Sequence, residues 1–310
     1  MTDPGDRALG LALLARAPFV HLASTRPDGS PLLRPIQCLL DGGTVVFHGR
    51  LTGEKVSAMG RRAVVSAVEV VADVPSWFFG ELACPADTLY ESVLAEGTLE
   101  PVGDATEKAR LLAAFTAKYQ PEGRHEPIEA AAPAYVTELK GTLVFRLPVE
   151  RLSVKRKLLQ NKSAELRLAL LEKLWERGAP GDAAAIERLR AADPSLPAPA
   201  FLRAPAGTTL HAALGEGDLA AAAALLGEPV DRVARRHRTA HAWVGARAAG
   251  ALVATVRAVS DGSETWVRDL AVASAWCGRG LGEALGALLR GHPAVRETSI
   301  ADMARERRPG

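Results

Sequence analysis

Apolar and polar residues alternate along much of the first half of the chain with the two-residue period of β-strands. Two β-rich segments, 19–25 and 32–40, flank the sequence RPDGSP, in which Asp-Gly provides the positive φ of a hairpin turn. Further strands are predicted over 44–49, 63–72, 91–102 and 143–157. Helices are predicted over 6–16, from a start at 52–60 and over 104–119, the last two with Thr52 and Asp104 as N-caps. Mostly antiparallel strands with few helices predict a mainly β fold, a barrel rather than a parallel sheet.

The pattern changes after this point to helices followed by mixed α/β order. A helix is predicted over 163–177, followed by a second short helix and a Pro-rich stretch. Beyond it the sequence predicts helix over 210–228, a hairpin over 241–259 and a strand over 265–272. We therefore expect a barrel over 1–160, a helical segment with a Pro-rich linker over 161–200, and an α/β domain over 201–310.

Composition adds a charge boundary to this division. The 310 residues are 48% hydrophobic and 24% charged, as in ordinary globular proteins. Residues 1–150 carry 14 basic and 19 acidic side chains, whereas residues 151–200 carry 10 and 6. An apolar run long enough for a membrane span and a signal-peptide pattern are both missing from the sequence, and its three cysteines are widely spaced. We expect a cytoplasmic protein without a metal site or membrane contact.

The clearest candidate chemistry in the first half lies in the stretch VVFHGRLTGEKVSAM. Gly49 and Gly53 permit close backbone approach, Thr52 offers a hydroxyl, and Lys55 adds a positive charge where a helix is expected to start. Such a turn can hold a phosphate monoester. A capped helix start with an exposed lysine explains the same residues equally well.

Three segments in this order resemble the FMN-binding split-barrel group related to pyridoxamine-phosphate oxidase, and the nitroimidazole-resistance type in particular. The segments are GSPLLRPIQCLL, the stretch just quoted, and the one beginning YESVLAEGTLEPV. The resemblance implies a homodimer with FMN at its interface, Lys55 near the phosphate and His48 beside the ring or substrate. The FMN neighbours that it implies are Arg34, Pro35, Ile36, Gln37, His48, Gly49, Lys55 and Ser92.

A second resemblance lies in KRKLLQNKSAELR, which is similar to a segment of the flavin-binding negative transcriptional regulators. It implies that Lys157, Gln160 and Asn161 face a cofactor or anionic substrate. The alternative is a basic helix start with a solvated face. The cluster lacks interleaved aromatic residues and a helix-turn-helix pattern, so direct DNA binding is not expected.

The stretch LAVASAWCGRGLGEAL resembles the pyrophosphate-binding motif of the GNAT acyltransferases, which joins their fourth strand to their third helix. Glycines at this turn let backbone N–H groups and a helix N-terminus approach a pyrophosphate. The resemblance implies that CoA is bound by Leu270, Val272, Gly278, Arg279, Gly280 and Gly282.

Two departures weaken the expectation of acyl transfer. Cys277 stands where the motif has Gln or Arg, and the family's later strands and its tyrosine acid have no counterpart, so the domain is expected to be abbreviated. Residues 296–303 are the expected fifth strand. A general base could be Glu264, Asp269 or His241, although a structural or solvent-facing role is the favoured explanation for each.

The sequence thus predicts an FMN-dependent oxidoreductase acting on a small aromatic or nitrogen-containing molecule, with an attached GNAT-like domain that binds acetyl-CoA. His48 and Glu264 are the candidate catalytic residues. The alternative is a flavin- or haem-binding sensor whose GNAT-like part is inactive. Haem, with His21 or His48 as ligand, and deazaflavin are the alternative cofactors.

Overall fold

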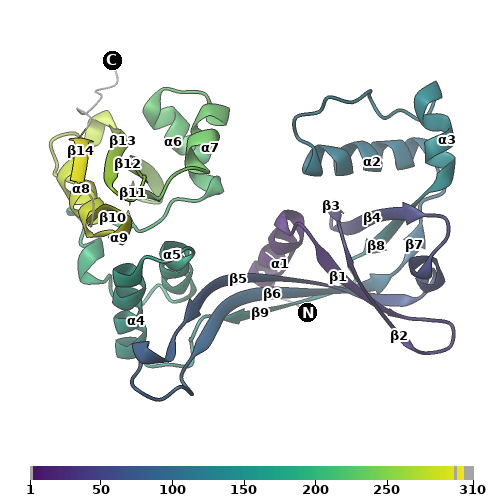
Figure 1. Ribbon diagram of the computed structural model, residues 1–310, viewed down its shortest axis with the longest axis horizontal. Coiled ribbons are helices and arrows are strands. Elements are labelled where there is room, and N and C mark those ends of the chain that lie inside the picture. The colour runs from purple at the N-terminus through teal and green to yellow at the C-terminus, as the bar shows by residue number, and fades with distance from the viewer. Residues whose placement is uncertain (1–2, 297–298, 304–310) are drawn as a thin grey trace. The chain divides into compact units, whose positions relative to one another are not determined.

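The computed structural model describes residues 3–296 and 299–303, and it divides the chain into two compact units (Figure 1). The barrel unit consists of Met1–Val70 and Tyr90–Arg156, and the sheet unit of Val71–Leu89 and Lys157–Gly310. The division therefore differs from the expected one, because residues 71–89 leave the barrel and residues 161–200 are part of a compact unit rather than a linker.

Two sheets, three α-helices and one 3₁₀ helix are described in the barrel unit. Strands β2, β1, β5, β6 and β9 form one sheet in that order, and β3, β4, β8 and β7 form the other. The elements are α1 (Pro4–Arg16), β1 (Val20–Thr25), β2 (Pro31–Ile36), β3 (Leu39–Asp41), β4 (Thr44–Arg50), η1 (Glu54–Ala58), β5 (Arg62–Val74), β6 (Asp87–Thr98), β7 (Glu100–Pro101), α2 (Ala105–Tyr119), α3 (Pro133–Gly141), β8 (Thr142–Pro148) and β9 (Arg151–Lys157). The registered pairs β1–β2, β1–β5, β3–β4 and β4–β8 are all antiparallel, as the alternating pattern predicts.

The alternation of side chains along the strands shows where the barrel core lies. Phe47 of β4 and Phe145 of β8 are fully buried and stack with ring centroids 5.0 Å apart, while the next residue on β4, His48, lies outside that core. Helix α2 covers the outer side of the second sheet through Leu111, which packs with Val46 and Val144. The carboxylate of Asp104 accepts a hydrogen bond from Glu107 N at 2.7 Å, which confirms the predicted N-cap of this helix.

Local predictions failed at several points in the barrel unit: the predicted strands 32–40 and 91–102 each contain parts of two strands, and helix α3 was not predicted. Residues 143–157 form two strands, β8 and β9, instead of one. The expected helix at 52–60 is the five-residue 3₁₀ helix η1, whose N-cap is Gly53 rather than Thr52. A helix this short has little of the dipole that a longer helix directs at a bound anion.

The sheet unit contains one five-stranded sheet in the order β10-β11-β12-β13-β14. The first four strands are antiparallel, and β14 joins β13 in parallel. The elements are η2 (Ser76–Phe78), α4 (Ala164–Arg177), α5 (Asp182–Ala192), η3 (Ala200–Leu202), β10 (Thr209–His211), η4 (Glu216–Asp218), α6 (Leu219–Leu226), α7 (Val230–His237), β11 (Ala242–Ala248), β12 (Ala251–Ser260), β13 (Glu264–Val272), η5 (Ser274–Trp276), α8 (Leu281–Gly291), α9 (Pro293–Arg296) and β14 (Ser299–Met303). The predicted helix over 210–228 begins instead as strand β10.

Helices cover both faces of this sheet (Figure 1). Alternate residues of β11 show the two faces: Trp243 packs with α6 and α7, whereas Val244 belongs to the core that includes α8. Helices α4 and α5 bury Leu174 and Ile186 in that same core. An amphipathic pattern shows that a helix buries one face without showing against what, so the sequence could not assign these helices to a unit.

Among the described residues, no helix is both long and apolar enough to cross a membrane.

Candidate functional site

In the barrel unit, side chains from β2, β4 and η1 form a group that we call the His48 cluster: Arg34, His48, Gly49, Glu54 and Lys55. The ammonium group of Lys55 donates a hydrogen bond to the main-chain oxygen of His48 at 3.2 Å. A Cβ on Gly49 would lie only 2.8 Å from Lys55 Nζ. Glycine at position 49 therefore lets the lysine lie across β4.

The His48 cluster is positively charged. Glu54 forms ion pairs with both Arg34 and Arg26, the latter at 3.1 Å, so one carboxylate is paired with two guanidinium groups. Burial lowers the pKa of Lys55. Lys55 thus brings positive charge to the end of β4, where Gly49 leaves room, and the arginines paired with Glu54 add to it, so the arrangement fits an anion such as a phosphate monoester.

His48 differs from these cations because its imidazole is uncharged at neutral pH. Burial, and secondly the charge of Lys55, lower the pKa of its imidazole below the usual value. Its ring meets the edge of Phe115 with centroids 4.7 Å apart. An uncharged imidazole in this position can accept or donate a hydrogen bond at neutral pH.

The remaining barrel residues predicted to contact a cofactor lie in different environments. Pro35 and Gln37 are exposed, but Ile36 is 7% exposed and belongs to the barrel core, so its side chain does not face a surface ligand. Ser92 lies on β6, which belongs to the same sheet as β2 but is separated from it by β1 and β5, and it lines a depression with apolar residues.

That depression, on the outer face of β5, β6 and β9, was missed by sequence reasoning. It has a volume of about 380 Å³ and is lined by Ser66, Val68, Val70, Tyr90, Ser92, Leu94, Ser153, Val154 and Lys155. Val68 and Val70 are 58% and 62% exposed, and Leu94 is 44% exposed. The signal was present in the sequence AVVSAVEVVA, which is apolar at positions on both faces of the strand.

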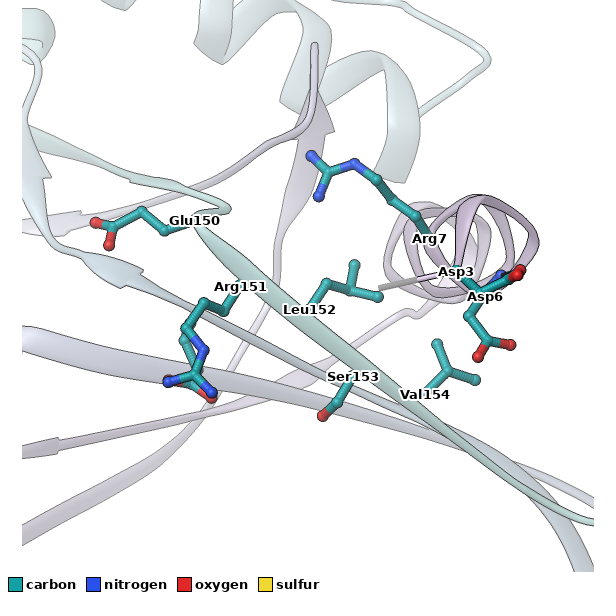
Figure 2. A pocket seen from close by; sticks show the side chains of 9 residues that line it. Asp3, Asp6, Arg7, Glu150, Arg151, Leu152, Ser153 and Val154 are labelled. Atoms are coloured by element: carbon teal, nitrogen blue, oxygen red, sulfur yellow. Dashed lines mark hydrogen bonds and ion pairs between the residues drawn. The ribbon is translucent and has the colours of Figure 1, made fainter. Parts of the chain in front are cut away.

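A second hollow of about 640 Å³ lies between the start of α1 and β9, where Figure 2 shows acidic and basic side chains interspersed. Most of its charged side chains already cap a helix or pair with an opposite charge. Asp3 caps α1, Glu150 pairs with Arg62, and Glu96 lies 3.9 Å from Arg151. None of the residues predicted to bind a ligand lies here. Among residues 3–296 and 299–303, His, Cys, Asp and Glu side chains form no group of three suited to a metal ion.

Lys157, Gln160 and Asn161 belong to the sheet unit and are not part of the His48 cluster. Lys157 forms an ion pair with Asp87, and the side-chain oxygen of Gln160 accepts a hydrogen bond from Leu158 N at 2.8 Å. Two of the three predicted residues thus have structural contacts near the junction of β9 and α4.

The glycine loop, residues 273–280, joins β13 to α8 in the sheet unit. Gly278 and Gly280 have φ of 72° and 80°, values that L-residues rarely adopt. Gly280 is the N-cap of the eleven-residue helix α8, and no side chain in the described part of the chain caps that helix, so its first amides point out of the helix uncapped. The guanidinium of Arg279 stacks on the ring of Trp276, 4.9 Å from its centroid.

The other residues predicted to contact CoA lie on either side of the glycine loop. Val272 is buried and Leu270 half-buried directly before the loop, and Gly282 comes after it in α8. Glu264 is the first residue of β13, roughly 26 Å of extended strand away from Val272. Its candidacy as a base acting beside the loop is therefore not supported by its position. His241 accepts a hydrogen bond from Ser260 N at 3.1 Å, a structural contact.

Comparison with known proteins relates the barrel unit to one protein family. Residues 6–156, just under half of the chain, match the family model described as pyridoxamine 5′-phosphate oxidase. The barrel unit is thus similar to the pyridoxamine 5′-phosphate oxidase family over residues 6–156. No curated protein matches the chain.

Solved structures similar to this chain include the flavocytochrome Anf3 from Azotobacter vinelandii, with 21% identity and a TM-score of 0.42 over 51% of this chain and 68% of that one. An FAD- and haem-binding protein from Mycobacterium smegmatis has 25% identity and a TM-score of 0.43 over 55% and 78%. A putative 5-nitroimidazole antibiotic resistance protein from Bacteroides thetaiotaomicron has 16% identity and a TM-score of 0.40 over 50% and 84%. At TM-scores this low, none of them defines a ligand for this chain.

Proposed function

We propose that the barrel unit binds a flavin nucleotide, with FMN as the first candidate, and that the protein is an oxidoreductase acting on a small aromatic or nitrogen-containing molecule. The observation that carries this proposal is the positively charged His48 cluster inside the segment that matches the pyridoxamine 5′-phosphate oxidase model.

A bound flavin would supply the electron-transfer chemistry, and the protein would supply placement and charge. In this proposal Lys55, held across Gly49, contacts the phosphate, and Arg34 adds positive charge beside it. Pro35 and Gln37 flank the ring from the exposed end of β2. The uncharged imidazole of His48 offers a hydrogen bond to the ring or to the substrate at neutral pH.

We further propose that two copies associate through the outer face of β5, β6 and β9. Exposed Val68, Val70 and Leu94 line one depression there, and a contiguous apolar patch is typical of an interaction site. Multi-angle light scattering of the full chain should then give a dimer, and Val70→Lys should give a monomer of unchanged far-UV circular dichroism. A wild-type monomer would contradict this.

A second proposal concerns the sheet unit: the glycine loop binds the pyrophosphate of acyl-CoA, as the resemblance to the GNAT motif implies. Its support is the pair of positive-φ glycines directly before an uncapped helix, at the end of strand β13. Such a turn aims main-chain N–H groups at an anion. If CoA binds but acetyl transfer to a panel of amines is never detected, the sensor alternative is favoured over an acyltransferase.

The test of the flavin proposal is titration of the purified full chain with FMN, followed by quenching of flavin fluorescence. Lys55→Ala should weaken FMN binding about 10- to 100-fold, since a hydrogen bond to a charged group contributes roughly 1.5–3 kcal/mol. Gly49→Ala should also weaken it, because the new Cβ displaces the lysine.

Lys108→Ala is the matched control. Lys108 also donates to main-chain oxygens, those of Leu139 and Thr142, but lies on α2. FMN affinity within twofold of wild type is expected for it. Equal losses in Lys55→Ala and Lys108→Ala, or no uptake of FMN, FAD or deazaflavin by the wild type, would refute the proposal. A Soret band on adding haem would instead favour the haem alternative.

A further inference from the structure

One residue of β13, Asp269, has a conformation that strands avoid. Its φ is +59°, in the left-handed region, although it lies inside a strand. The register explains why: Thr255 pairs with Ala271 and Arg257 pairs with Arg268, so Asp269 and Leu270 together face the single residue Val256 of β12. This is a β-bulge, in which an extra residue bends the strand and re-aims the side chains beyond it.

Glycine is the usual residue at a left-handed bulge position, so the presence of aspartate calls for a reason in its side chain. One carboxylate oxygen accepts a hydrogen bond from Arg236 Nη1 at 3.0 Å, and the other accepts one from Arg257 Nε at 2.8 Å. We call Asp269, Arg236 and Arg257 the Asp269 lock. The Asp269 and Arg257 side chains are only 17% and 10% exposed.

The Asp269 lock joins three elements of the sheet unit. Arg257 comes from the neighbouring strand β12, and Arg236 comes from helix α7, where it also pairs with Glu228 at 3.0 Å. Because both carboxylate oxygens are engaged by arginines, Asp269 is poorly placed to accept a proton from a substrate. It is well placed to hold the bulge in one register.

The bulge leads directly into Leu270–Val272 and then into the glycine loop. A strand that slipped by one residue would turn the side chains of Leu270 and Val272 to the opposite face. We propose that Asp269 is a positioning residue: its two arginine contacts hold the β13 bulge so that Leu270 and Val272 are aligned for the pantetheine arm of acyl-CoA. This inference rests on the CoA-binding proposal for the glycine loop.

The experiment compares Asp269→Asn, Asp269→Gly and Arg236→Gln in the full chain with the control Arg235→Gln. Arg235 is the neighbour of Arg236 on α7 and pairs with Asp231 at 2.9 Å, so the control removes an ion pair of the same helix without touching the bulge. Two readouts are used: hydrogen exchange of the amides of residues 270–272, and calorimetric affinity for CoA and for ADP, which has the pyrophosphate but not the pantetheine arm.

In Asp269→Asn and Arg236→Gln, exchange at residues 270–272 should accelerate at least fivefold, and CoA should bind at least tenfold more weakly. Affinity for ADP should stay within twofold, which a general loss of structure would not allow. Asp269→Gly, which accepts the left-handed φ but lacks the carboxylate, should resemble Asp269→Asn. Wild-type behaviour of Asp269→Gly, or of Arg236→Gln, would overturn the proposal.

Failure of the two proposals can be told apart. If the wild type binds neither CoA nor ADP, the CoA proposal is refuted, and unchanged exchange in the lock variants would refute the lock as well. If Asp269→Asn does not fold, Arg236→Gln decides, because the Arg236 side chain is 30% exposed and its loss leaves the Asp269–Arg257 pair in place.

Discussion

In the barrel unit the candidate anion site consists of side chains, with Lys55 lying across Gly49 and Arg34 paired to Glu54. In the sheet unit it consists of main chain, the N–H groups of a loop whose Gly278 and Gly280 have positive φ. A site of the first kind depends on charge and on the room that glycine leaves. A site of the second kind depends on backbone angles. Substituting a glycine should therefore affect the two kinds of site for different reasons, lack of room in the first and a strained backbone angle in the second.

The largest effect is expected from a barrel glycine that provides room rather than a backbone angle. A Cβ on Gly97 of β6 would lie 2.1 Å from the main-chain oxygen of Pro148, which cannot move without displacing β8. Gly97→Ala should lower the free energy of unfolding by about 3 kcal/mol, at the upper end of the range for overpacking. Urea unfolding followed by circular dichroism measures this.

Gly49→Ala is the matched control for that prediction. Its Cβ meets the flexible end of Lys55 instead of main chain, so stability should change by less than about 0.5 kcal/mol, as at most surface sites. Comparable loss of stability in both variants would mean that Lys55 is not free to move aside.

A smaller effect on stability is expected at the glycine loop. Gly280 has φ of 80° and its nearest neighbour, a carboxylate oxygen of Glu283, would be 3.8 Å from a Cβ, so the position has room but a strained backbone angle. Gly280→Ala should cost about 1–2 kcal/mol, the usual penalty for a left-handed L-residue. It should also weaken CoA binding while leaving FMN binding within twofold.

Thermal unfolding and the two ligand titrations check this prediction. Loss of FMN affinity in Gly280→Ala would show that the two sites are not independent. Retention of full CoA affinity would show that the loop does not need its left-handed angle to present its amides.

Much of the fold and of the two candidate sites was predictable from the sequence. What was not predictable depends on contacts between segments that are distant in the sequence. The mainly antiparallel barrel, the N-cap at Asp104 and the juxtaposition of His48 with Lys55 come from local pattern, because neighbouring elements fix them. The Asp269 lock was invisible, because its three residues come from α7, β12 and β13 and the bulge has no pattern of its own. The apolar outer face of β5 was visible only as excess hydrophobicity, since periodicity does not show what covers a strand.

The smallest effect concerns the pH dependence of the two units. Burial lowers the pKa of His48 in the barrel unit and of His237 in the sheet unit. The folded chain therefore binds fewer protons than the unfolded chain just below the usual histidine pKa, about 6.5, and stability rises with pH through that window. This contribution to stability is lost as the pH falls through the pKa values of the two histidines in the folded state. His48→Gln and His237→Gln should each flatten part of the slope of the urea midpoint against pH.

The neighbours of the two histidines sharpen this prediction. Lys55 adds to the lowering of the His48 pKa, whereas Glu216 and Asp218 oppose the lowering at His237 and Arg238 adds to it. Lys55→Ala should therefore raise the pKa of His48, measured by NMR titration of its imidazole, and leave that of His237 unchanged. An unchanged His48 titration would mean that Lys55 does not lie across β4 in solution, and the charge assigned to the barrel site would lose its main support.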